Sequence, residues 1–367
     1  MNMNKMIVSN LAHRPLRSII SIFAVAVEVT LILLIVGFAL GTLNDSKART
    51  KGMGADLMVR PPGSSMFAAL SAAPMPIKIG DVIAQQPHVV AVAPVLVQTS
   101  SKLEILSGID LKAFESLGGP MRYLDGGPFR EPFDMIVDEY YAANEKVRVG
   151  STVKALDHEF HVAGIVPQGR GSRAYVPITT LQNLTGAPDK ATVFYVKVDD
   201  PKNAGAVAGQ IKSIAGMGDY NIMTMEEWLS LMSVDHLPML SKFIDIVIWI
   251  SVVIGFLVIF QSMYTAVMER TREIGILKSL GASKVFVVRV ILRETLVLAV
   301  GGIFAGIIIS YVAAHAIRYK IPTAQVQFTG FWLAKAAIIA ILGSIVGASY
   351  PAFKAAQKDP IDALAYE

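Results

Sequence analysis

Residues 268–283, MERTREIGILKSLGAS, hold side chains of both charges at helical spacing between two long apolar runs. As a helix, this segment has a narrow, less polar face formed by Thr271, Ile274, Leu277 and Gly281. The charged side chains on the remaining surface are Glu269, Arg270, Arg272, Glu273 and Lys278. Gly281 suits the left-handed residue that ends a helix, and Ser283 suits the N-cap of the next one. Such a segment is either a solvated turn with anchoring cations or a docking helix, residues 268–280, for a cytoplasmic partner.

A second candidate is Glu28, which lies inside the first apolar run. It is about ten residues into that run, hence roughly 15 Å deep at about 1.5 Å per residue. A carboxylate at that depth costs about 2.5–3.5 kcal/mol, so we expect it to face protein or to be protonated. Ser344 lies at a similar depth in the fourth run and is a possible partner. A buried contact, a proton or substrate role, and a protonated group facing lipid all stay open.

No catalytic or metal-binding pattern is present. His158 and His161, in HEFH, lie in an expected strand, where a spacing of three places them on opposite faces. The sequence has no cysteine, which excludes disulfides and thiolate metal sites. It also lacks the G-x-S-x-G turn of serine hydrolases. We therefore expect no catalytic residue, no metal and no enzymatic activity on this chain.

The composition predicts membrane helices combined with a folded external domain. Of the 367 residues, 53 % are hydrophobic and only 17 % are charged. Four apolar runs, 18–43, 244–267, 295–316 and 331–352, are long enough to cross about 30 Å of hydrocarbon. The first run is longer than the apolar core of a signal peptide, which has about 7–15 residues. It is therefore interpreted as a retained membrane anchor. The fold expected is an α-helical membrane protein, with one span before and three after a large external α/β domain.

Basic residues near the ends of these runs predict the orientation. They are Lys5, Arg14, Arg17, Arg270, Arg272, Lys278, Lys284, Arg289, Arg293, Lys354 and Lys358. Because cytoplasmic loops are enriched in Lys and Arg, residues 1–17, 268–294 and 353–367 are expected in the cytoplasm. Residues 44–243 and the short loop 317–330 are then external. This predicts a multi-pass protein of the cell inner (cytoplasmic) membrane.

The external residues 44–243 predict an α/β domain. Strand-like runs punctuated by Gly and Pro alternate with helical stretches, and strands near 191–223 are expected to pair with strands near 89–110. Residues 111–188 would then form an inserted β-rich subdomain.

Small residues recur at a spacing of four in every apolar run. The pairs are Gly37 and Gly41, Ser251 and Gly255, Gly302 and Gly306, and Gly343 and Gly347. Such pairs let helix backbones approach closely, either within one chain or at a seam between two copies.

Several stretches together resemble the MacB/FtsX-type permeases of ABC transporters, a family that includes the LolC/LolE-like permeases. ERTREIGILKSLGAS is similar to the signature loop of that family. IVDEYYAANEKVRVGSTVKALDHEFHVAGIV followed by RAYVPITTLQNLTG is similar to its external domain, and GADLMVRP and PAFKAAQKDPIDALAYE also fit. MacB carries a fused nucleotide-binding domain, whereas these 367 residues contain no G-x-x-x-x-G-K-[ST].

The resemblance implies a dimeric permease, with a second permease copy, whose loop helix docks on a separate cytoplasmic ABC ATPase. ATP and Mg²⁺ would bind on that ATPase, and this chain would need no cofactor. Carried over by position, the coupling residues are Glu269, Arg270, Thr271, Arg272, Glu273, Ile274, Gly275, Leu277, Lys278, Gly281 and Ala282. A periplasmic membrane-fusion protein and an outer-membrane tunnel are further partners that the resemblance admits; nucleic acid is not expected.

The resemblance leaves the cargo open. It allows export of drugs or peptides, extraction of lipids or lipoproteins, or an FtsX-like mechanotransmitter that activates a periplasmic partner without transporting anything. A membrane-anchored sensor would need a cytoplasmic output domain. An intramembrane enzyme would need paired catalytic groups at bilayer depth, where only Glu28 is found.

Overall fold

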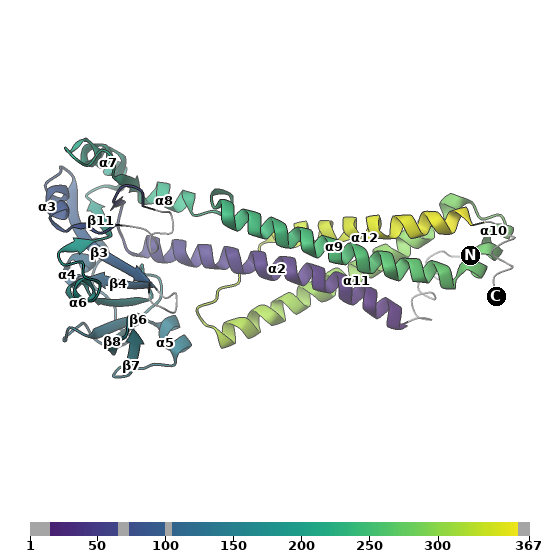
Figure 1. Cartoon of the computed structure of the whole chain (residues 1–367), viewed down its shortest axis with the longest axis horizontal. Coiled ribbons are helices and arrows are strands. Elements are labelled where there is room, and N and C mark those ends of the chain that lie inside the picture. Colours follow the sequence, from purple (N-terminus) through teal and green to yellow (C-terminus); the bar gives the residue numbers. More distant parts are fainter. Residues whose placement is uncertain (1–14, 65–72, 100–104, 359–367) are drawn as a thin grey trace. The chain divides into compact units, whose positions relative to one another are not determined.

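The computed structural model describes residues 15–64, 73–99 and 105–358, and these residues form two compact units (Figure 1). One unit is helical and contains described residues up to 41, 238–319 and 326–358. The other is built on a β-sheet and contains residues of 42–237 together with 320–325. The division agrees with the expected fold class of membrane helices plus an external α/β domain.

Four helices of the described chain are long and apolar enough to cross a membrane. They are α2 (Pro15–Gly52), α9 (Pro238–Glu269), α11 (Lys284–Lys320) and α12 (Gly330–Gln357). All four are longer than the apolar runs that predicted them. A hydrocarbon core needs only about 20 helical residues, so the additional turns can carry polar side chains beyond it.

Glycines set the close contacts within the helical unit. A Cβ placed on Gly302 of α11 would lie 2.5 Å from Val25 Cβ of α2, and one on Gly306 would lie 2.8 Å from an α2 backbone oxygen. On α12, a Cβ at Gly347 would lie 3.0 Å from the Phe256 oxygen of α9. Real Cβ atoms do not fit such gaps, so α2 meets α11, and α9 meets α12, nearly backbone to backbone.

The other small residues have different neighbours. Gly37 lies against the segment that precedes α12: Gln327 N donates to its carbonyl at 2.9 Å. Ser251 is buried, and its hydroxyl donates to Val247 O within α9. Gly41 is buried as well. Gly255 and Gly343 face a carboxyl group that is described below.

The external unit contains one large sheet, with strand order β12-β1-β11-β3-β4-β9-β6-β8-β5 and β7 paired to β8. Its strands are β1 (Leu57–Arg60), β3 (Val89–Thr99), β4 (Ile105–Ile109), β5 (Asp125–Gly126), β6 (Asp134–Asp138), β7 (Thr152–Ala155), β8 (His158–Val166), β9 (Ala174–Pro177), β11 (Val193–Val198) and β12 (Asn221–Thr224). A separate pair joins β2 (Met75–Pro76) to β10 (Lys190–Ala191). The helices are α3 (Lys78–Ala84), α4 (Leu111–Gly118), α5 (Glu139–Glu145), α6 (Ile178–Leu184), α7 (Ala204–Ser213) and α8 (Met225–Leu231).

The expected pairing between early and late strands is confirmed, because β11 lies antiparallel to β3 with Tyr195 opposite Ala93. The subdomain expected at residues 111–188 is not a separate sheet. Its strand β9 pairs in parallel with β4, so the same sheet continues through it. The insertion therefore extends the sheet at one end.

Alternation along β1 assigns its side chains to the two faces of the sheet. Leu57 and Val59 pack in a core with residues of α3 and α7. Met58 packs on the opposite face, in a core with Phe114 of α4 and Trp228 of α8. Helix α8 starts with a capping box formed by Thr224 and Glu227.

The glycine contacts predict a sharp difference between adjacent residues of α11. Gly302→Leu should lower the melting temperature of the full chain in detergent, because a side chain there would overlap α2 and cost about 1–3 kcal/mol or more. Gly301→Leu is the matched control, because a Cβ there meets Ile22 at an ordinary 3.5 Å. Equal melting temperatures for the two variants would contradict the crossing described here.

Candidate functional site

Helix α10 (Thr271–Ser279) connects α9 to α11. The expected end of this helix is confirmed: Gly281 has φ +95°, and Ser283 Oγ accepts from Phe286 N at 3.2 Å as the cap of α11. The start differs from the expected helix at 268–280, because α9 continues to Glu269 and Arg270 leaves the helical conformation. The Thr271 hydroxyl donates to the Val267 and Met268 carbonyls and so satisfies the end of α9.

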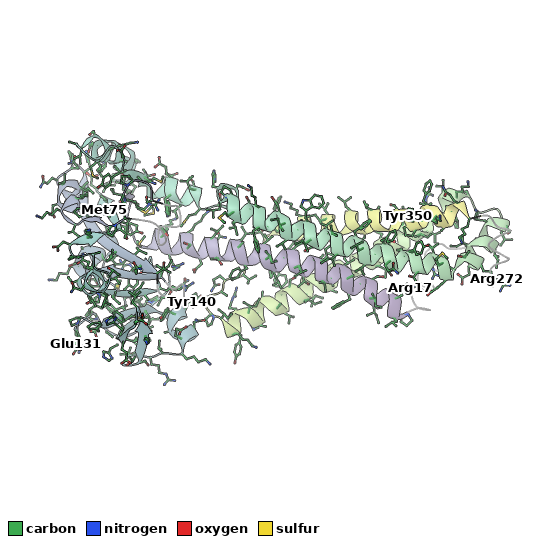
Figure 2. All side chains as sticks on the ribbon, in the orientation of Figure 1. Arg17, Met75, Glu131, Tyr140, Arg272 and Tyr350 are labelled. Carbon is green, nitrogen blue, oxygen red and sulfur yellow. The ribbon has the colours of Figure 1, made fainter. Side chains whose placement is uncertain are left out.

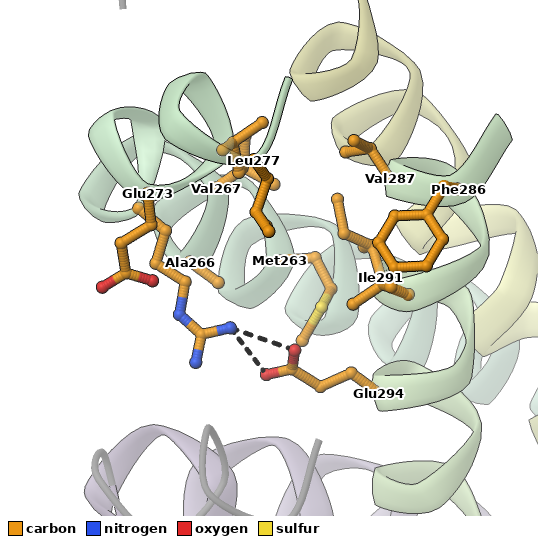
Figure 3. Close-up of a pocket in the computed structure, with 12 residues that line it drawn as sticks. Met263, Ala266, Val267, Glu273, Leu277, Phe286, Val287, Ile291 and Glu294 are labelled. Atoms are coloured by element: carbon orange, nitrogen blue, oxygen red, sulfur yellow. Dashed lines mark hydrogen bonds and ion pairs between the residues drawn. The ribbon is translucent and has the colours of Figure 1, made fainter. Parts of the chain in front are cut away.

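Two charged residues at this break contact neighbouring helices. Glu269 forms an ion pair with Arg17 of α2, whose label in Figure 2 lies near the start of that helix. Arg270 Nη1 lies 3.1 Å and 3.4 Å from the two carboxylate oxygens of Glu294 on α11, as the dashed lines in Figure 3 mark. The side chains of Arg270 and Glu294 are only 13 % and 9 % exposed. This second pair is therefore largely withdrawn from water.

A third contact ties the far end of α10 to α12. Lys278 Nζ donates to Ala356 O at 3.0 Å and also to Lys358 O. Backbone carbonyls at the C-terminal end of a helix carry partial negative charge, which favours an ammonium group there. Glu269, Arg270 and Lys278, expected on a docking surface, thus contact α2, α11 and α12 of their own chain.

The inner side of α10 faces a pocket of about 220 Å³ between α9 and α11 (Figure 3). Ile274 and Leu277 line this pocket together with apolar residues of both helices. Thr271 and Gly275 are buried. The residues predicted to form one less polar docking face therefore pack mainly inward, because positions 271, 274, 275 and 278 repeat at helical spacing on the inner side.

A different apolar pair is exposed on α10. Ile276 is 46 % exposed and Leu280, directly after the helix, is 81 % exposed. Arg272, which Figure 2 labels, is exposed beside them, and Glu273 is exposed at the edge where it also lines the pocket. Sequence reasoning missed Ile276 and Leu280, although their spacing of four is the signal that could have found them. We call Arg272, Glu273, Ile276 and Leu280 the outer face of α10.

Glu28 is 2 % exposed and lies within the helical unit. A Cβ on Gly255 of α9 would lie 2.0 Å from Glu28 Oε2, and one on Gly343 of α12 would lie 3.8 Å from Oε1. The carboxyl group thus occupies the space that these glycines leave. Ser344, the possible partner, makes no hydrogen bond with it: among the described residues, neither Glu28 Oε1 nor Ser344 Oγ has a hydrogen-bond partner. The carboxyl group is turned toward Gly255 instead.

Within the external unit, Arg173 joins three segments that lie far apart in the sequence. Its guanidinium lies 2.7 Å from Asp45 of α2 and 3.1 Å from Asp138, and it donates to Thr323 O at 3.4 Å. Burial raises the pKa of Asp138, while its hydrogen bond to Tyr141 N and the nearby Arg173 oppose that shift. Arg173 therefore fixes residues 42–52 of α2 and the connection 320–325 to the external sheet.

Family models match most of the chain. The MacB-like periplasmic core domain matches residues 18–214, and the FtsX-like permease C-terminal model matches residues 246–361. The uncharacterized ABC transporter permease YknZ of Bacillus subtilis is 33 % identical over 205 residues, which are 53 % of this chain and 50 % of YknZ. The macrolide export ATP-binding/permease protein MacB of Bdellovibrio bacteriovorus is 26 % identical over 240 residues, 61 % of this chain and 37 % of MacB.

Among solved structures, the periplasmic region of MacB from Actinobacillus actinomycetemcomitans aligns with a TM-score of 0.37 and 20 % identity, covering 48 % of this chain and 92 % of that one. The matches to the two curated relatives span half of their length or less. The two family models together account for both units and for the connection between α9 and α11. The chain therefore belongs to the ABC transporter permeases that combine a MacB-like periplasmic core domain with an FtsX-like permease C-terminal region.

Proposed function

We propose that this chain is the permease subunit of an ABC transporter and that a separate cytoplasmic ATPase docks on the outer face of α10. The observation that carries the proposal is the exposure of Ile276 and Leu280 beside Arg272 and Glu273. Apolar side chains with charges around them are the composition of a protein interface. In this proposal ATP and Mg²⁺ bind on the partner.

The proposed orientation follows from charge. Arg272, Lys278 and Lys284 lie in or next to the α9–α11 connection, which favours the cytoplasmic side of the inner membrane for that connection. Because four membrane-spanning helices are described, both ends of the described chain then lie on the cytoplasmic side of the membrane. The β-sheet unit is external in this arrangement.

The contacts of α10 support a coupling role. A helix held only by its two connections could move without moving its neighbours. Ion pairs reach from this connection to α2 and α11, and Lys278 reaches the end of α12. A displacement of a docked ATPase would therefore act on the other membrane helices as well as on α9.

Helix α2 offers a route to the external unit. It is one continuous helix from Pro15 to Gly52, and its residues from Thr42 onward belong to the external unit. Arg173 and Asp45 hold that end to the sheet. We propose that tilting of α2, paired with a second permease copy, moves the external domain and exports or extracts an envelope substrate, such as a drug, peptide, lipid or lipoprotein. A membrane-fusion protein is a further proposed partner.

The docking proposal is tested by co-purification with the cognate ATPase in detergent. Ile276→Asp combined with Leu280→Asp should reduce recovery of the ATPase at least about tenfold, because buried apolar anchors dominate such interfaces. Ile276→Val combined with Leu280→Met is the matched control and should keep recovery near that of the parent. Unchanged recovery from the Asp double variant, with a normal melting temperature, would refute docking on this face.

The ion pair between Arg270 and Glu294 gives a second prediction. Glu294→Gln should lower the melting temperature, since it leaves the part-buried Arg270 guanidinium without its carboxylate partner. It should also weaken stimulation of the ATPase in the complex while leaving co-purification within about twofold of the parent. Exchanging the charges, with Arg270→Glu and Glu294→Arg together, should recover part of both losses. No recovery by the exchanged pair would argue against a direct interaction.

A further inference from the structure

The carboxyl group of Glu28 on α2 is enclosed by helices of its own unit. It is 2 % exposed, and its two oxygens face glycines of two other helices. Oε2 lies against Gly255 of α9, where a Cβ would be 2.0 Å away, and Oε1 is 3.8 Å from a Cβ placed on Gly343 of α12. The parts of α2, α9 and α12 around it are all described. Its removal from water is therefore complete within the described chain.

Two buried polar atoms in this region have no hydrogen-bond partner among the described residues. They are Oε1 of Glu28 and Oγ of Ser344, the residue after Gly343 in α12. A buried carboxylate loses its hydration, and without a donor it gains no hydrogen bond in exchange. A protonated carboxyl group carries no charge and therefore loses much less on burial. The surroundings of Oε1 thus favour the protonated form of Glu28.

The four long helices carry their other charged or titratable side chains far from this level, which is marked by Glu28, Gly255, Gly343 and the α11 stretch 302–306. The nearest of them along each helix, in either direction, are Arg17 and Asp45 of α2, Asp245 and Glu269 of α9, Glu294 and His315 of α11, and Lys335 and Lys354 of α12. Eight positions, the shortest of these separations, correspond to about 12 Å at about 1.5 Å per residue. Two tyrosines are closer along the chain, Tyr311 and Tyr350, and they contact the rings of Phe328 and Phe260. An ionised Glu28 would therefore have no cation of these described helices beside it.

A second polar contact joins the same faces of α2 and α9. Ser21 Oγ lies 2.6 Å from Ser262 Oγ, and either hydroxyl could donate. Ser21 precedes Glu28 by seven residues, which is about two helical turns. Ser262 follows Gly255 by seven residues as well. The serine pair therefore lies on the same line of contact as Glu28, and a separation of the helices at Glu28 should also weaken the serine contact.

We propose that Glu28 is a proton-binding site, which holds its proton while α2 is packed on α9 and α12 and releases it to water when α2 separates from them. In the packed arrangement the proton keeps the enclosed carboxyl group neutral. After separation, water solvates the carboxylate and accepts the proton. By linkage, a proton held only in the packed arrangement stabilises that arrangement at low pH, and this stabilisation is lost as the pH rises. The proposal adds a control to the movement of α2, and its tests use the chain without an ATPase, so they do not depend on docking.

Infrared difference spectroscopy of the full chain in phosphatidylcholine nanodiscs tests whether the proton is bound. At about pH 7, the spectrum of the parent minus that of Glu28→Gln should contain the C=O band of a protonated carboxyl group. Asp245→Asn, at an exposed carboxyl group of α9, is the matched control and should reveal only carboxylate bands. Carboxylate bands without a protonated C=O band in the Glu28→Gln difference would overturn the proposal.

Disulfide crosslinking tests the link between the proton and the packing of α2. Because the chain contains no cysteine, Ser21→Cys combined with Ser262→Cys introduces one reporter pair. Its rate of oxidation by copper phenanthroline is compared with and without Glu28→Gln at about pH 6 and about pH 9. The effect of pH on the thiols is common to both backgrounds, so the ratio of their rates reports the helix contact.

The two rates should agree within about twofold at about pH 6. At about pH 9, the background that retains Glu28 should crosslink at least about fivefold more slowly, because its carboxylate favours the separated helices whereas the neutral glutamine does not. Equal rates at both pH values would refute the link between proton and packing. Melting temperature identifies misfolded variants, and if Glu28→Gln does not fold, Glu28→Ala supplies the uncharged background for both experiments.

Discussion

The part-buried ion pair between Arg270 and Glu294 constrains which way the connecting helix faces. Both side chains are largely withdrawn from water, so their separation would leave an uncompensated charge at the packed junction of α9, α10 and α11. Keeping the pair together fixes the rotation of α10 about its axis. With that rotation fixed, Ile274 and Leu277 point into the pocket, and Ile276 and Leu280 are left on the outside. The surface that α10 leaves exposed is thus determined by a contact within the chain.

The helical unit depends on a second constraint: glycines, which have no side chain, occupy the points where helices cross. Gly302 and Gly306 let α2 approach α11, and Gly347 lets α9 approach α12. Close contact between backbones leaves little freedom for one helix to slide along its neighbour without steric overlap. Together with the charged contacts of α10, this packing favours movement of the helices as linked bodies. Linked movement is what a permease needs if an event at α10 is to reach the far end of α2.

Much of the architecture could be predicted from the sequence because local signals specify it. Long apolar runs predicted the four membrane helices, and Gly281 and Ser283 predicted the corner after α10. The orientation of α10 could not be predicted, because charged residues occur on all of its sides and two apolar pairs compete for the inner face. Only the contacts with α9 and α11 decide between these pairs.

The residues missed in the external unit share another cause. Arg173 meets Asp45 across 128 positions of the sequence, and no local pattern encodes such a pairing. The strand LMVR predicts alternation, but the covering of its Arg60 by Trp228 depends on how α8 returns to the sheet. The strands of the sheet were easier to predict, since runs of hydrophobic residues mark them in the sequence. Side chains that bridge distant elements are therefore where sequence reasoning loses most information, and these bridges carry the candidate functions.

Four charged or titratable groups that are buried or partly buried show how differently one chain can offset the free-energy cost of removing a charge from water. Arg173 lies against the carboxylates of Asp45 and Asp138, and Arg270 lies against that of Glu294, so each links elements that are distant in the sequence. Glu28 occupies a gap over Gly255, and its Oε1 has no partner among the described residues. Arg60 lies against the Trp228 ring at the wall of a pocket in the external unit. A charge that is paired within the chain contributes mainly to stability and to the arrangement of the elements that it joins. By that argument, Arg173 stabilises the external unit, and Arg270 stabilises the junction of α9, α10 and α11.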